Sequence, residues 1–385
     1  EFILHLIPSG ILYPEVRCLL GNGVVVDPWV LAKEMDSLRA RGIELDGRLG
    51  VSQRAHLVLP YHRALDMAEE NSLGESKIGT TGQGIGPAYQ DKIVRRGLRF
   101  GDLVTVDRTH TIIANGVERT NIALAGFGND SRLDTDEVMA SIEEVRDTML
   151  ALVTDTGDEI RTGLAAGGRV LLEGAQGALL DIDHGTYPFV TSSTTTSGGA
   201  ASGVGIGPTL IDGVLGVVKA YITRVGAGPL PTELSGSEAE HLRQLGGEFG
   251  ATTGRPRRPG WFDATVARHA AHVNGLTALA VTKLDVLDSF AAIRLATGYE
   301  LNGTQVPSFP YSVEDLTGVT PVYEECVGWN DDTTNCRTFG ELPELAQIYL
   351  GKIERECRTP IRFVSVGPAR RETIQVTGVV DATVV

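Results

Sequence analysis

Lys283 and Asp285 lie directly after an apolar run, in the order Thr282-Lys283-Leu284-Asp285. The run at residues 278–281 predicts a strand, which would hold the Asp285 carboxylate at the strand's end. A carboxylate there can accept hydrogen bonds from both the ring N–H and the exocyclic amino group of guanine, whereas adenine offers no matching pair of donors. The Lys283 stem can lie across the face of the base. The alternative is a surface Lys and Asp that only end a strand.

A glycine-rich segment at residues 79–86 precedes four cationic side chains, Lys92, Arg95, Arg96 and Arg99. Their spacing is that of one face of a helix, so the pattern predicts a basic helical face after a glycine-rich turn. The glycine backbone N–H groups and the cations are suited to hold a phosphate. A solvated basic face after a flexible turn is the alternative.

Two predicted strand ends offer polar groups that could contact a nucleotide. Gln176 follows an apolar run at residues 169–172 and could hydrogen-bond the edge of a base, and Thr191 could cap a phosphate. Residues 365–368, with the sequence Ser-Val-Gly-Pro, could offer a backbone N–H to a base oxygen. A plain turn is an equal alternative for this second strand end.

Arg255, Arg257 and Arg258 are set among Gly and Pro at residues 250–260. Guanidinium groups bind carboxylate and phosphate through two parallel hydrogen bonds, so this loop is a candidate anion site. Ordinary surface charge is the alternative.

Asp181, Asp183 and His184 invite a metal site, but they lack the wider set of ligands that a known metal cage supplies. We expect structural hydrogen bonds for them instead. Residues 192–202 are almost all Ser, Thr, Gly and Ala, a composition more typical of a mobile loop than of a ligand cradle.

Short β-branched runs alternate with amphipathic stretches along the chain. Continuous apolar runs predict strands covered on both faces, at residues 24–26, 169–172, 214–221, 279–281 and 361–364. Asp27-Pro28 predicts the start of one helix and Asp134-Thr135 the start of another. Strands that alternate with helices predict an α/β fold with a large, mostly parallel central sheet flanked by helices. No linker divides the sequence, so we expect residues 1–385 to form a single domain.

The composition limits the partners and the compartment. The 385 residues are 42% hydrophobic and carry a formal charge of −15, so the chain can bury a core, and nucleic acid is not expected as a partner. No apolar run reaches the ~18 residues of a membrane span. The 4 cysteines lack Cys-x-x-Cys spacing and the first residues lack the basic start of a signal peptide. We therefore expect reduced thiols in a cytoplasmic protein.

Three longer segments, residues 84–95, 173–188 and 250–255, resemble the adenylosuccinate synthetase family, and the resemblance runs from His5 to Thr373. Enzymes of this family join IMP and L-aspartate at the expense of GTP, with Mg²⁺, in purine biosynthesis. The resemblance implies a fold like that of P-loop NTPases. It also implies two steps, in which GTP phosphorylates the ring oxygen of IMP and the aspartate amine then displaces that phosphate. Metal and cations would neutralise the charge on the moving phosphoryl group.

The resemblance further implies which residues bind each substrate. IMP should contact Thr81, Arg95, Gln176, Thr191 and Arg255, with Arg95 supplied by the other subunit of a homodimer. L-Aspartate should bind the loop formed by Ala251, Thr252, Thr253, Gly254, Arg255, Pro256 and Arg257. The guanine of GTP should lie against Lys283, Leu284, Asp285, Ser365, Val366 and Gly367, and Arg257 should also approach GTP. Lys92 matches a lysine that is important in the family, and we expect it to support the anion site electrostatically rather than to transfer protons.

Two features depart from the family's pattern. Relatives carry a Gly-Asp-Glu-Gly-Lys-Gly phosphate loop, whose Asp serves as general base and Mg²⁺ ligand, and a later His-Thr pair that supplies the general acid. Neither motif occurs in this sequence, which begins at the segment that follows them in relatives. We therefore expect an N-terminally truncated chain, without the first strand and without Mg²⁺ ligands of its own, and little or no synthetase activity. Gln83 stands where relatives often carry a basic residue, which predicts weaker aspartate binding.

Two other functions are compatible with the candidate nucleotide-binding residues. A GTP-binding switch protein would share Lys283 and Asp285, but it needs a Gly-x-x-x-x-Gly-Lys-Ser/Thr loop that the sequence lacks. A catalytically dead paralogue would keep the contacts to IMP and GTP without turnover. We favour an incomplete reading frame of an ordinary enzyme over such a paralogue.

Overall fold

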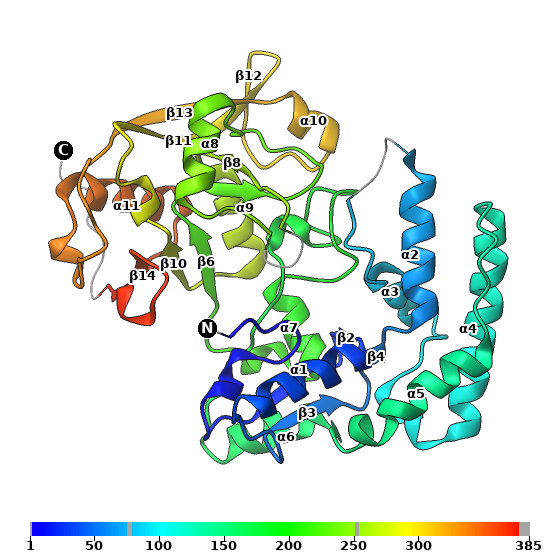
Figure 1. Cartoon of the computed structure of the whole chain (residues 1–385). Helices are drawn as coiled ribbons and strands as arrows, with labels where there is room; N and C mark the ends of the chain where they lie inside the picture. The colour runs from blue at the N-terminus through cyan, green and yellow to red at the C-terminus, as the bar shows by residue number, and fades with distance from the viewer. Residues whose placement is uncertain (1, 75–78, 251–253, 377–385) are drawn as a thin grey trace. The chain divides into compact units, whose positions relative to one another are not determined.

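The computed structural model describes residues 2–74, 79–250 and 254–376 of the chain (Figure 1). These residues fall into two compact units, each with its own hydrophobic core. The first unit comprises Glu1–Gln176 and Thr191–Leu210, and the second comprises Gly177–Val190 and Ile211–Val385. The single domain expected from the sequence stays a prediction. None of the described helices is long and apolar enough to cross a membrane.

The first unit contains two small parallel sheets. The larger has the strand order β1 (Cys18–Leu20), β3 (Leu49–Ser52) and β5 (Val153–Thr154), and the smaller pairs β2 (Val25–Val26) with β4 (His56–Leu57). Its α-helices are α1 (Pro28–Ala40), α2 (Pro60–Ser72), α3 (Ile85–Ile93), α4 (Val106–Gly126), α5 (Thr135–Leu150), α6 (Thr156–Ala165) and α7 (Ser197–Val204). Its 3-10 helices are η1 (Ser9–Leu12), η3 (Phe100–Val104) and η5 (Pro208–Leu210).

The two helix starts predicted from the sequence are confirmed. The Asp27 carboxylate accepts hydrogen bonds from the backbone N–H groups of Trp29 and Val30, and Pro28 occupies the first position of α1. The Asp134 carboxylate caps α5 in the same way. Because both caps satisfy backbone donors that a helix start leaves unpaired, they fix where each helix begins.

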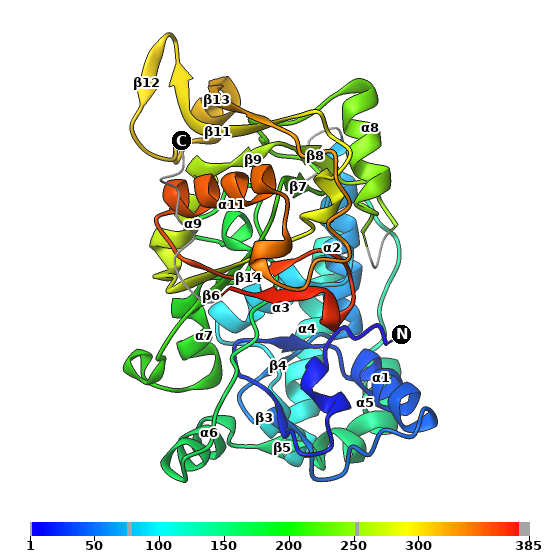
Figure 2. The ribbon, with the colours of Figure 1, turned by 90° about the vertical axis from the view of Figure 1, so that its left-hand side faces the viewer.

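The second unit is built around a four-stranded sheet with the order β15 (Thr373–Gln375), β14 (Ile361–Ser365), β10 (Ala278–Thr282) and β6 (Leu215–Lys219). Strands β14, β10 and β6 are parallel, and β15 is antiparallel to β14. The strands predicted at residues 24–26, 214–221, 279–281 and 361–364 are therefore confirmed. The expectation that both faces are covered is wrong for β6, in which Leu215 and Val217 are 47% and 69% exposed. Helices α9 (Ala264–Asn274) and α11 (Glu344–Cys357) lie side by side above this sheet in Figure 2.

A second sheet in this unit contains β12 (Thr304–Val306), β11 (Ala292–Leu301) and β13 (Thr320–Val327), with β9 (Phe262–Asp263) paired to β11. A separate antiparallel pair joins β7 (Ile222–Arg224) and β8 (Arg258–Gly260). The remaining helices are η4 (Ala178–Leu180), α8 (Gly236–Leu245), η6 (Asp285–Leu287), α10 (Val313–Gly318), η7 (Phe339–Glu341) and η8 (Arg370–Glu372). The mixture of helices and mostly parallel strands confirms the predicted α/β fold.

Two predicted elements are wrong. Residues 169–172 form no strand, and Val170 and Leu171 are 42% and 89% exposed. An extended segment needs a neighbouring strand to satisfy its backbone groups, and within the described residues none pairs with it. The uncharged segment at residues 192–202 is not all loop, since α7 begins at Ser197.

Candidate functional site

The ends of β10 and β14 bring the residues of the predicted guanine site together. The two strands are parallel and directly paired, with Val281 opposite Val364. Their carboxyl ends therefore lie at the same edge of the sheet, where parallel α/β sheets commonly bind ligands. The Leu284 N–H donates to the Ser365 carbonyl across a distance of 3.1 Å. This bond links the segment of residues 283–285 to the segment of residues 365–367.

Asp285 presents a buried hydrogen-bond acceptor at this edge. Its Oδ1 atom is buried and has no hydrogen-bond partner among the described residues. Burial raises the pKa of the Asp285 carboxyl, and the negative charges of Asp288 and Glu372 act in the same direction. A buried acceptor without a donor is costly, so a ligand that supplies N–H donors would be favoured here. Beside it, the Ser365 hydroxyl donates to the Gly367 carbonyl at 2.7 Å.

Lys283 turns away from the strand in a left-handed backbone conformation, with φ of 60°. Its ammonium group donates to the Gly246 carbonyl and, at 2.8 Å, to Oε1 of Glu248. Its side chain is 33% exposed. These bonds fix the ammonium end of the side chain while leaving part of the stem accessible.

Glu248 is the centre of a cluster of charges that the sequence did not reveal. Its side chain is fully buried and accepts hydrogen bonds from Lys219, Tyr221, Arg257 and Lys283. Burial alone would raise the pKa of the Glu248 carboxyl, but the hydrogen bonds from Lys219, Lys283 and Tyr221 outweigh it and lower the pKa to about 2. Burial lowers the pKa of Lys219 to about 8, and Glu248 partly offsets that effect.

The loop expected to bind aspartate starts and ends at this cluster. The Arg257 N–H donates to the Glu248 carbonyl at 2.9 Å, and the Gly250 N–H donates to the Arg255 carbonyl at 2.8 Å. Arg243 donates from Nε to the Arg257 carbonyl. The flanks of the loop are thus paired with each other. Ala251, Thr252 and Thr253 lie outside the described residues, and Gly254, Arg255 and Pro256 are exposed.

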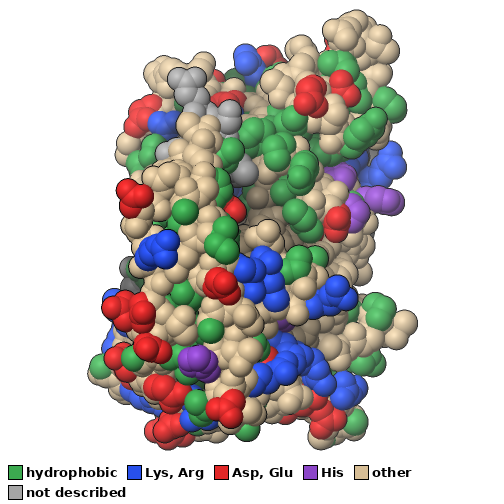
Figure 3. Space-filling model, turned by 90° about the vertical axis from the view of Figure 1, so that its right-hand side faces the viewer, with side chains coloured by type: hydrophobic (Ala, Val, Ile, Leu, Met, Phe, Trp, Pro, Cys, Tyr) green, Lys and Arg blue, Asp and Glu red, His purple; other side chains and the backbone are tan. Residues whose placement is uncertain are grey.

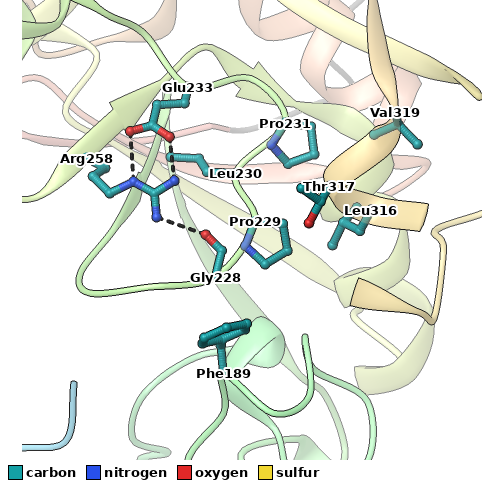
Figure 4. Close-up of a pocket in the computed structure, with 10 residues that line it drawn as sticks. All are labelled: Phe189, Gly228, Pro229, Leu230, Pro231, Glu233, Arg258, Leu316, Thr317 and Val319. Carbon is teal, nitrogen blue, oxygen red and sulfur yellow. Dashed lines mark hydrogen bonds and ion pairs between the residues drawn. The ribbon is translucent and has the colours of Figure 1, made fainter. Parts of the chain in front are cut away.

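The Arg258 guanidinium group is bound by hydrogen bonds within the protein and is not left free to bind an anion. Its guanidinium group forms two hydrogen bonds with the Glu233 carboxylate and one with the Gly228 carbonyl (Figure 4). This ion pair lies at a cavity of about 410 Å³ in the second unit. Leu230, Leu316 and two prolines, Pro229 and Pro231, form much of its wall. Of the residues expected to bind IMP, aspartate or guanine, none that the structure describes lines this cavity.

The four cations after the glycine-rich segment do not share a helical face, so that prediction is wrong. Helix α3 ends at Ile93, and Arg95 adopts a left-handed conformation with φ of 64°. Arg96 instead binds Asp91, and Arg99 binds Asp102, which also accepts a hydrogen bond from Arg108. Lys and Arg side chains gather on one face with Asp and Glu side chains interspersed among them (Figure 3).

Lys92 supports a neighbouring glycine-rich turn. Its ammonium group donates to the Asn22 carbonyl at 2.7 Å, and the Tyr89 hydroxyl donates to the Gly23 carbonyl at 2.7 Å. Burial lowers the pKa of Lys92. Its side chain thus holds the backbone at residues 21–23, and its expected electrostatic role in anion binding stays a prediction.

Carboxylates of α2 already occupy two of the backbone donors in the segment at residues 79–84. The Gly84 N–H donates to Asp66 at 2.8 Å, and the Gly79 N–H donates to Glu70 at 2.7 Å. Those two groups are therefore not offered to a phosphate as the sequence suggested. Thr81 is exposed, and its carbonyl accepts a long hydrogen bond of 3.5 Å from Gln83.

Gln176 and Thr191 belong to the first unit, where Gln176 is exposed with φ of 61° and Thr191 is partly buried. Asp181 in the second unit is fully buried and accepts from the N–H groups of Asp183 and His184. The expected structural hydrogen bonding of these residues is confirmed. Among the described residues, no group of three or more His, Cys, Asp or Glu side chains is placed to hold a metal ion.

Comparisons with known proteins agree over almost the whole chain. A family model described as adenylosuccinate synthetase matches residues 1–374. The adenylosuccinate synthetase of Carboxydothermus hydrogenoformans is 51% identical over 374 residues, which are 97% of this chain and 87% of that protein. The adenylosuccinate synthetase of Moorella thermoacetica is 49% identical with the same coverage. The solved structure of fully ligated adenylosuccinate synthetase from Plasmodium falciparum has a TM-score of 0.92 at 36% identity, covering 98% of this chain and 88% of that one.

Proposed function

Because this chain belongs to the adenylosuccinate synthetase family, we propose that its substrates are IMP, L-aspartate and GTP, and that its product is adenylosuccinate. Members of the family are ligases that form a carbon–nitrogen bond in AMP biosynthesis. One observation supports the guanine part of this proposal most strongly. The Asp285 carboxylate has a buried oxygen that finds no hydrogen-bond partner in the described part of the chain, at a strand end beside Ser365 and Gly367.

In the proposed guanine site, Asp285 accepts the ring N–H and the exocyclic amino group of the base. The Lys283 stem lies along the base, with its ammonium group held by Glu248. The backbone around Leu284, Val366 and Gly367 borders the base, and a backbone N–H there meets the base oxygen. Adenine would leave the Asp285 oxygen without its donors, and this provides the discrimination against ATP.

The proposed sites for IMP and aspartate use polar and cationic side chains. Thr81, Gln176 and Thr191 contact IMP, together with Arg255. The loop at residues 251–257 binds the aspartate carboxylates, for which its guanidinium groups are suited. Arg257 also approaches GTP.

The proposed reaction has two steps. The terminal phosphoryl group of GTP passes to the ring oxygen of IMP, which makes a poor leaving group into a good one, and the aspartate amine then displaces the phosphate. The cations of this chain stabilise negative charge as it moves, with Lys92 as electrostatic support. Mg²⁺, which the family generally uses, would neutralise phosphate charge. Since the described residues offer no cluster to hold it, we assign no step to a metal in this chain.

We also propose that a chain of only the printed 385 residues turns over slowly, because they include neither the Gly-Asp-Glu-Gly-Lys-Gly loop nor the later His-Thr pair. In the family, that Asp serves as general base and that His as general acid, so a chain without them would move the IMP ring proton slowly. Adenylosuccinate formation from the three substrates, followed by absorbance, should remain near the uncatalysed rate. Turnover near 1 per second, within the usual range of enzymes, would contradict this.

Arg95 is proposed to reach the phosphate of IMP in the partner subunit of a homodimer. It is exposed, and the apolar side chains just before it, Ile93 and Val94, are 76% and 45% exposed. Exposed apolar groups beside a cation are suited to a protein interface. Sedimentation should therefore find a dimer whose dissociation weakens IMP binding.

Calorimetric titration of the purified chain tests the proposed substrates. GDP should bind at least about 100-fold more tightly than ADP, and IMP should bind as well. Equal affinity for GDP and ADP would overturn the guanine site. GDP binding without IMP binding would favour a GTP-binding switch protein, and binding of both without turnover even after the missing motifs are supplied would favour a dead paralogue.

A further inference from the structure

Glu248 is a buried carboxylate whose four partners come from three separate segments of the second unit. Lys219 ends β6, Tyr221 lies just beyond it, Lys283 follows β10, and Arg257 closes the loop that begins after Glu248. The distances from Glu248 to the nitrogens of Lys219, Lys283 and Arg257 are each 2.8 Å at the nearest oxygen. A carboxylate with no exposed surface is stable only with such partners.

Its two oxygens divide these partners in a specific way. Oε1 accepts from Lys283 and Tyr221, whereas Oε2 accepts from Arg257, and Lys219 reaches both oxygens. The Glu248 main chain also accepts the Arg257 N–H. One residue therefore connects the strand end that carries Lys283 to the flank of the loop that carries Arg257.

The charges of the cluster make this connection necessary. Lys219, Arg257 and Lys283 bring three positive charges to a single negative one, and each is partly exposed, by 23%, 27% and 33%. Without the carboxylate the cations would repel one another at short range. Lys283 and Arg257 would then lose the shared acceptor that sets their positions.

We propose that Glu248 is a positioning residue that holds Lys283 of the guanine site and Arg257 of the aspartate loop in a single arrangement. The roles given to Lys283 and Arg257 rest on the proposed function, whereas their attachment to Glu248 rests on the contacts alone. Glu248 itself is buried behind both side chains, so it acts through them and not on the substrates.

The loop side of the proposal can be tested by proteolysis of the full chain. Trypsin does not cut before proline, so the Arg255–Pro256 and Arg258–Pro259 bonds are resistant, and the Arg257–Arg258 bond is the site that reports on Arg257. Glu248→Gln keeps the shape of the side chain and removes its charge. We expect cleavage of this bond, identified by fragment mass, to be at least about tenfold faster in Glu248→Gln because local opening becomes easier.

The guanine side is tested by GDP titration of wild type, Glu248→Gln, Lys283→Met and the double variant. Each single substitution should weaken GDP binding about tenfold. The double variant should be little worse than either single one, because both remove the same positioned lysine. Lys283→Met should leave the cleavage rate at Arg257 unchanged. Glu324→Gln is the matched control, since Glu324 also bridges two cations, Lys352 and Arg355, and should change neither measurement.

The outcomes separate this inference from the proposed function. Unchanged cleavage and unchanged GDP affinity in a folded Glu248→Gln variant would overturn the inference. So would a loss of GDP affinity in the double variant that equals the product of the two single losses, about 100-fold. A wild-type chain that does not bind GDP would overturn the guanine site and the guanine half of the inference, while faster cleavage would still support the loop half. If Glu248→Gln does not fold, Glu248→Asp keeps the charge but is one methylene too short to reach all its partners. It should weaken GDP binding about threefold, and wild-type affinity would contradict the proposal.

Discussion

The two units of this chain differ in how many cations share one carboxylate. In the first unit, Asp91 pairs with Arg96 and Arg119, and Asp102 pairs with Arg99 and Arg108. In the second unit, three cations share the single buried carboxylate of Glu248. Two cations on each carboxylate leave a smaller excess of positive charge than the three partly exposed cations around Glu248. A chain with a net charge of −15 thus retains a local basic region in the second unit.

This difference shows that a count of cations does not locate an anion site. The four cations after the glycine-rich segment are the denser group in the sequence, yet two of them are paired and Lys92 is bound to a backbone carbonyl. Lys219, Arg257 and Lys283 are far apart in the sequence and are brought together only by folding. Whether a cation remains available for a ligand depends on how many other cations share its carboxylate partner.

The largest effect on stability is expected in the first unit. Asp91 is buried and pairs with Arg96 at 2.6 Å and with His62 at 3.2 Å. Asp91→Ala should reduce the free energy of unfolding by about 3 kcal/mol, because it leaves buried partners without an acceptor. Urea unfolding measures this loss. Asp147→Ala is the control, since the side chain of Asp147 is 98% exposed and its loss should change the value by less than about 0.5 kcal/mol. An equal loss in both variants would contradict the assigned importance of the pair.

In the second unit the main effect should be on binding. Asp285→Asn should weaken GDP binding by about 100-fold, because the amide nitrogen cannot accept from the amino group of guanine. The same amide can donate to the second carbonyl of xanthine, so XDP should bind the variant better than the wild type does. Calorimetric titration of both nucleotides measures this change of preference from GDP to XDP. A variant that still prefers GDP to XDP would show that Asp285 does not recognise the base by hydrogen bonds.

The dependence of stability on pH should come partly from His56 in the first unit. Burial, and then the positive charges of Lys92 and Arg99, lower the pKa of His56 to about 4. The unfolded chain, with an ordinary histidine pKa near 6.5, therefore binds a proton first as the pH falls. The stability that neutral His56 contributes is fully present above about pH 6.5 and should be lost progressively as the pH falls from about 6.5 toward about 4. Denaturant unfolding of wild type and His56→Asn measures it, and equal slopes in the two proteins would contradict this origin.

The smallest effect on stability is expected at Arg95, whose left-handed conformation is unfavourable for a residue with a side chain. Arg95→Gly should raise the free energy of unfolding by at most about 0.5 kcal/mol, since the greater freedom of glycine in the unfolded chain offsets most of the relief. It should nevertheless weaken IMP binding. Arg358→Gly is a matched control, because Arg358 has φ of 53° and is assigned no ligand. A similar loss of IMP affinity in both variants would remove Arg95 from the site.

Local signals in the sequence predicted much of the fold. The caps Asp27 and Asp134, and four of the continuous apolar runs, depend on residues that are close in the chain, so their patterns are readable without the fold. The run at residues 169–172 failed because a strand also requires a partner, which no local pattern supplies. The expected basic face failed because the chain turns at Arg95.

The candidate site was predicted only where its residues follow directly after a recognisable strand. Lys283 and Asp285 share one strand end, and residues 365–367 share the adjacent one, so parallel pairing was enough to join them. Glu248 was missed because its partners come from distant segments. Its one local signal was its place immediately before the loop at residues 250–260.

A crystal structure of the chain with bound GDP tests the central claim most directly. The account predicts that the guanine ring lies at the ends of β10 and β14, with its ring N–H and its amino group each about 3 Å from an oxygen of Asp285. The stem of Lys283 should lie along the base while its ammonium group stays on Glu248. GDP bound at this edge without contact to Asp285, or bound elsewhere on the chain, would contradict the account.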